Sequence, residues 1–71
     1  MKVKDLYNVI SPFQNLQIAD SKTAAPLTFV SYIADSGCEI SNYEEYEIYG
    51  IAPKKDKEGN LYLAILIVME M

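Results

Sequence analysis

The stretch from Leu61 to Met69 constrains the fold most strongly, because it holds nine apolar residues without a polar break. It is about half as long as a membrane-spanning helix needs to be. As a β-strand it has two apolar faces, one with Leu61, Leu63, Ile65, Ile67 and Met69 and the other with Tyr62, Ala64, Leu66 and Val68. Neither face is polar enough for full solvation, so we expect a central strand covered on both faces or a strand at an interface.

The remaining sequence predicts one short helix and three further strands. Val3, Leu6, Tyr7 and Ile10 recur at helical spacing, and a proline at position 12 ends that helix. Strands are expected at 16–20, 27–33 and 45–52, with a turn at 35–37, a helical turn at 41–44 and a charged hairpin loop at 54–60. We predict a single α+β domain over 1–71, with one short N-terminal helix packed on an antiparallel sheet of about four strands.

The composition narrows the chemistry that the chain can perform. The 71 residues include six lysines and ten acidic residues, for a net charge of −4, and no arginine, histidine or tryptophan. The chain therefore cannot use histidine for acid-base catalysis, and it cannot bind phosphates through the bidentate hydrogen bonds of an arginine guanidinium group. The acidic balance argues against nucleic-acid binding. No phosphate loop or paired metal ligands occur, so we predict no enzyme activity, no cofactor and no metal site.

The single cysteine and the N-terminus bear on localisation. Cys38 cannot form an internal disulfide, and without a nearby base it is better interpreted as a structural residue than as a nucleophile. The first residues do not have the pattern of a signal peptide, and no Asn-x-Ser/Thr acceptor occurs. We expect a cytoplasmic protein with no membrane partner.

The segment 39–49 concentrates four of the ten acids and three of the six tyrosines. Tyrosines supply large, stiff contact area, and carboxylates attract basic partners. We therefore regard this acidic tyrosine-rich segment as a candidate protein-binding surface. A strand with a solvated acidic face is the alternative. The candidate residues are Tyr43, Glu44, Glu45, Tyr46, Glu47 and Tyr49.

The two-sided apolar strand at 61–69 supports a different function. If its second face is not covered within one chain, a second copy can cover it. The chain would then be a structural homo-oligomer, and the candidate interface residues are Tyr62, Leu66 and Val68.

Four local patterns together extend over most of the chain. They comprise the opening Val3–Tyr7 helix, the strand at 16–20, the turn at 41–45 and the final pair through 46–48 and 63–68. This arrangement resembles small uncharacterised proteins encoded by phages and prophages of Gram-positive bacteria. The resemblance implies a phage or mobile-element origin and carries over no catalytic residues. Our first hypothesis is a non-enzymatic protein–protein interaction module that binds a host protein through the acidic tyrosine-rich segment.

Overall fold

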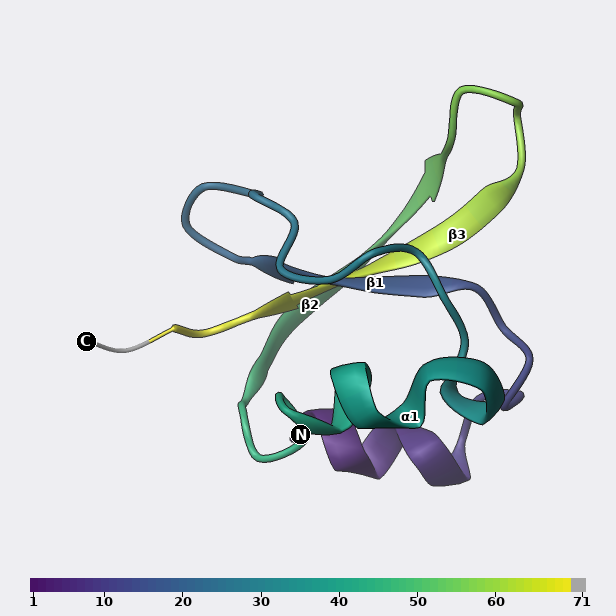
Figure 1. Ribbon diagram of the computed structural model, residues 1–71. Helices are drawn as coiled ribbons and strands as arrows, with labels where there is room; N and C mark the ends of the chain where they lie inside the picture. The colour runs from purple at the N-terminus through teal and green to yellow at the C-terminus, as the bar shows by residue number, and fades with distance from the viewer. Residues whose placement is uncertain (70–71) are drawn as a thin grey trace.

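The structure is a computed structural model that describes residues 1–69, with residues 36–38 described by their backbone only. Along the chain it contains two short helical segments and three strands (Figure 1). They are the 3-10 helix η1 (Val3–Asn8), β1 (Leu16–Asp20), α1 (Ile33–Ser41), β2 (Ile48–Lys55) and β3 (Leu61–Ile67). The combination agrees with an α+β class. No helix among the described residues is long and apolar enough to cross a membrane.

The sheet is mixed, and β3 is its central strand. The strand order is β1-β3-β2, with β1 parallel and β2 antiparallel to β3. The central position explains the long apolar run, since both edges of β3 are hydrogen-bonded and its inner face is buried. The prediction of about four antiparallel strands was wrong in strand number and in direction. Parallel pairing of β1 with β3 requires the crossover through α1, which the sequence pattern did not reveal.

The predicted strand at 27–33 is an irregular segment along the outer edge of β1. Isolated antiparallel bridges join Leu16 to Ser31 and Ala19 to Pro26. The regular ladder is interrupted between them because the buried Thr28 side chain replaces a backbone acceptor, its Oγ1 accepting the N–H of Ile18 at 3.1 Å. The segment therefore protects the β1 edge without becoming a fourth strand of the sheet.

The N-terminal helix is a 3-10 helix rather than the expected α-helix. The N–H of Val3 donates to Tyr46 O, and that of Lys4 donates to Glu44 O, both at 3.0 Å. The Asp5 carboxylate accepts the backbone N–H of Lys2 at 2.9 Å and so caps the helix start. Because a 3-10 helix has three residues per turn, the buried Val3 and Leu6 lie on the same side of η1.

Helix α1 occupies the region where a turn was predicted at 35–37. Ser and Gly at positions 36 and 37 are typical turn residues, but the backbone is helical through both. Ile33 and Ile40 lie two helical turns apart, and both pack against the core. Burial of this apolar face outweighs the local turn preference. The side chain of Cys38, interpreted above as structural, lies outside the described part of the chain.

The hairpin loop predicted at 54–60 joins β2 to β3, and Asp56 organises its turn. Its Oδ1 accepts the N–H groups of Glu58 and Asn60, each at 2.9 Å. These hydrogen bonds lower the pKa of the Asp56 carboxyl, and the one from the backbone N–H of Asn60 contributes most. Gly59 has a φ of +86°, which a side chain would disfavour. Chain reversal here therefore depends on an Asx-type turn and one glycine.

The hydrophobic core lies between the sheet and the two helical segments, which cover the same face of the sheet (Figure 1). The strands contribute alternate residues, and the helical segments contribute three more side chains. Seven buried residues form the cluster: Val3, Leu6, Leu16, Ile18, Ile40, Ile65 and Ile67.

Trimming the core at Ile65 tests this packing. Ile65 is 0% exposed, whereas its register partner Ile51 on β2 is 45% exposed. We expect Ile65→Val to lower the free energy of unfolding by about 0.5–1.5 kcal/mol in urea titrations. The matched Ile51→Val should stay within about 0.5 kcal/mol of the parent. Equal losses in both variants would contradict the assignment of Ile65 to the buried centre of the core face and of Ile51 to its exposed edge.

The Thr28 hydroxyl gives a second test. Thr28→Val removes the acceptor for the N–H of Ile18, and we expect a loss of about 1–3 kcal/mol in the free energy of unfolding. Thr28→Ser keeps the hydroxyl and should lose less. If serine were as costly as valine, the methyl group rather than the hydrogen bond would hold this segment on β1.

Candidate functional site

Residues 44–48, the central part of the acidic tyrosine-rich segment, are held from two sides. On one side, besides the bonds from η1, the N–H of Ile48 donates to Met1 O at 2.8 Å. On the other side, Glu47 O accepts the N–H of Val68 at 3.0 Å. The segment therefore lies between the start of the chain and the residue that follows β3, and its backbone groups are fixed by main-chain hydrogen bonds.

The carboxylates of this segment contact groups in the N-terminal residues. Glu45 is paired with Lys4 at 2.9 Å and with Lys2 at 3.3 Å. Glu47 Oε2 lies 3.1 Å from the amino group of Met1. Internal cations therefore neutralise part of the negative charge that the sequence concentrates here.

A third carboxylate, that of Glu44, faces a tyrosine hydroxyl. Tyr7 Oη donates to Glu44 Oε2 at 3.5 Å. Partial burial raises the pKa of Tyr7, and the charge of Glu44 and this hydrogen bond raise it further. The pair links η1 to the turn that follows α1.

The ion pairs of Glu45 shift the pKa values of two groups in opposite directions. Hydrogen bonds from Lys4 and then from Lys2 lower the pKa of the Glu45 carboxyl. The same contact with Glu45 raises the pKa of Lys4. Both side chains are exposed, so each pair is a solvent-screened surface contact.

The three tyrosines of the segment do not form one exposed patch. The rings of Tyr43 and Tyr46 lie 5.6 Å apart, and both residues are half-buried against the core. Tyr49 is 72% exposed and lies where β2 bulges, between Ile48 and Gly50. Two of the six predicted partner-binding residues therefore have a packing role, and Tyr49 stands apart from them.

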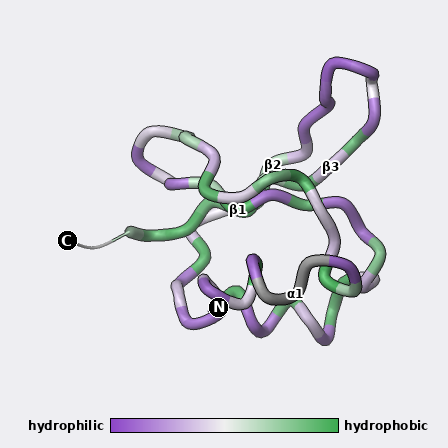
Figure 2. Tube along the Cα trace, in the orientation of Figure 1, coloured by the Kyte–Doolittle hydropathy of each residue, from purple (hydrophilic) through white to green (hydrophobic). Residues whose placement is uncertain are grey.

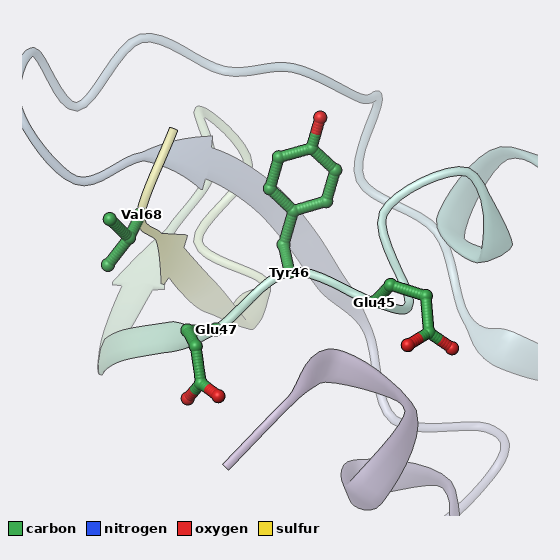
Figure 3. A pocket seen from close by; sticks show the side chains of 4 residues that line it. All are labelled: Glu45, Tyr46, Glu47 and Val68. Carbon is green, nitrogen blue, oxygen red and sulfur yellow. The ribbon is translucent and has the colours of Figure 1, made fainter. Parts of the chain in front are cut away.

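An open hollow of about 540 Å³ lies beside the segment, lined by Glu45, Tyr46, Glu47 and Val68 (Figure 3). The Tyr46 ring points away from the two carboxylates (Figure 3). The structure thus brings three predicted partner-binding residues together with Val68, predicted to lie in an oligomer interface. The sequence analysis missed this juxtaposition. Its available signal was the hairpin of the last two strands, whose register sets Glu47 beside Val68.

The other two predicted interface residues, Tyr62 and Leu66, lie on β3 and are half-buried. They point to the face opposite the core, because their neighbours Ile65 and Ile67 belong to the core cluster. β3 is central, so these residues can contact a partner only through the sheet face and not by edge pairing.

Chemically, the hollow can hold an apolar side chain beside Tyr46 and Val68, while the carboxylates of Glu45 and Glu47 are directed away from the Tyr46 ring (Figure 3). Among the residues that the structure describes, no group of three or more His, Cys, Asp or Glu is placed to hold a metal ion. No family model, curated protein or solved structure matches this chain.

The Glu45 ion pairs make stability depend on pH in a defined direction. Because the folded-state pKa of Glu45 lies below its ordinary 4.5, its contribution is full above that value and is lost as pH falls through the folded pKa. Glu45→Gln should therefore be less stable than the parent near neutral pH, and the difference should shrink in acid. Urea titrations across this range test it, with Glu58→Gln in the hairpin turn as control. A difference independent of pH would contradict the ion-pair assignment.

Proposed function

We propose that this protein is a non-enzymatic protein–protein interaction module whose contact site is the hollow between Tyr46 and Val68. One observation carries the proposal. Two side chains from distant parts of the sequence leave an open, partly apolar hollow with carboxylates at its border. This pairing of apolar walls with charge suits a protein side chain better than a reaction centre.

The preferred ligand is an apolar side chain next to a lysine or arginine. A half-buried tyrosine offers contact area at low entropic cost, and nearby carboxylates favour a cation. Glu45 is already paired with Lys2 and Lys4, but surface ion pairs of this kind contribute little and exchange readily. A basic partner can therefore compete for Glu45 while η1 stays fixed by its buried residues.

The proposed biological partner is a host protein. The pattern-level resemblance to phage and prophage proteins supports this choice, since such a factor acts inside a bacterial host. The chemistry above describes the partner surface that we expect: an exposed apolar residue with adjacent basic residues.

A peptide-display selection against the purified protein tests the site, whichever host protein is the partner. We expect enriched peptides to combine an apolar residue with lysine or arginine, and Val68→Asp to weaken their binding at least tenfold, about 1.4 kcal/mol. The exposed Tyr49→Ala serves as the matched control and should bind like the parent. Circular dichroism establishes that both variants are folded.

Two results would overturn the proposal. One is that no selected peptide binds the parent. The other is that Val68→Asp and the parent bind the peptides equally, which would place the contact elsewhere on the molecule.

A further inference from the structure

The outer edge of β2 is open along most of its length. β2 is an edge strand of the sheet, and the N-terminal segment pairs with the chain only just before β2 begins, through the bridge between Lys2 and Glu47. Past residue 48, the described residues place no further strand or bridge along this edge. The edge of β1 differs, because the segment at 26–31 runs beside it. β2 therefore presents main-chain groups to any strand that approaches.

The side chains along the open edge favour association more than they prevent it. Tyr49 is 72% exposed and Ile51 is 45% exposed. An exposed apolar edge strand is a typical site of edge-to-edge pairing between chains. Charge protects the far end, where Lys54 and Lys55 lead into a loop that is hydrophilic in the tube coloured by hydropathy (Figure 2). The uncharged residues 49–53 need protection of another kind.

The strand register turns the nitrogen of Pro53 toward this open edge. Pro53 lies opposite Leu63 in the antiparallel pairing of β2 with β3. Leu63 donates its N–H to Asn15 O at 3.0 Å, on the β1 side. Two opposite residues of an antiparallel pair either bond to each other or both point away from each other. The main-chain groups of Pro53 therefore point outward, where its ring nitrogen has no hydrogen to donate.

We infer that Pro53 closes the outer edge of β2 against the addition of a strand from another chain. An added strand would bond to the outward groups of alternate residues, which are Ile51, Pro53 and Lys55. Proline removes the middle donor and places its ring in the path of the ladder. The outward N–H groups that remain, those of Ile51 and Lys55, lie about 13 Å apart along the strand. A continuous ladder cannot form between them.

Sedimentation of the full chain from about 10 µM to 1 mM tests the inference. Pro53→Thr supplies the outward N–H together with a side chain that favours strands. We expect this variant to self-associate at a concentration at least about tenfold below the parent. Ala52→Thr is the matched control, because it places the same residue where the N–H points to β3. It should sediment like the parent.

Hydrogen exchange identifies the surface that associates. In the associated Pro53→Thr variant, the outward amides of Ile51 and Lys55 should exchange at least about tenfold more slowly than in the parent. Pro53→Ala restores the same N–H with a small side chain and repeats the test if circular dichroism shows that the threonine variant is unfolded.

Three results would overturn the inference: folded Pro53 variants that sediment like the parent, equal association of Ala52→Thr, or an associated variant whose outward amides still exchange as in the parent. The inference goes beyond the proposed function, because Pro53 does not line the hollow. Dilute Pro53→Thr should bind the selected peptides like the parent, so a failure of the edge and a failure of the hollow are distinguishable.

Discussion

The pairing of β3 with strands on both of its edges is the constraint on which the rest of the structure depends. Its inward residues Ile65 and Ile67 are fully buried and face Ile18 of β1 and the two helical segments. Parallel pairing with β1 and antiparallel pairing with β2 fix where the crossover must run. The helical segments then lie on one face, because the inward side of β3 needs cover. The sheet therefore determines which of its faces the helical segments cover.

The N-terminal residues complete this arrangement by electrostatics as well as by burial. Val3 and Leu6 enter the core, while Lys2 and Lys4 reach Glu45 across the same junction. The buried side chains and the main-chain hydrogen bonds supply most of the free energy that stabilises this contact, since exposed ion pairs contribute little. The ion pairs matter more for the charge of the surface. They give an acidic segment a partly balanced charge, and for this reason we propose apolar contact as the main source of its affinity for a partner.

The apolar strand, the hairpin turn and the apolar side of the N-terminal segment could be predicted, because alternation, helical spacing and turn residues are local signals. The parallel pairing of Leu16–Asp20 with β3 and the helix at Ile33–Ser41 could not. Both depend on burial against distant residues, and that burial overrides the turn preference at positions 36 and 37. The candidate site divides in the same way. The residues around Tyr46 could be predicted as a candidate binding surface from their types, but their position beside Val68 could not. That contact forms only in the folded chain, where Glu47 O accepts the N–H of Val68 after the end of β3.

The hollow and the sheet face opposite the core are both partly apolar, and they differ in charge. The hollow at Tyr46 has two glutamates among its four lining residues, and we propose that it binds one side chain by shape and charge. The sheet face opposite the core is nearly uncharged and has small side chains at its centre. Val68 follows β3 directly and lines the hollow, which makes the two surfaces neighbours at the end of the last strand.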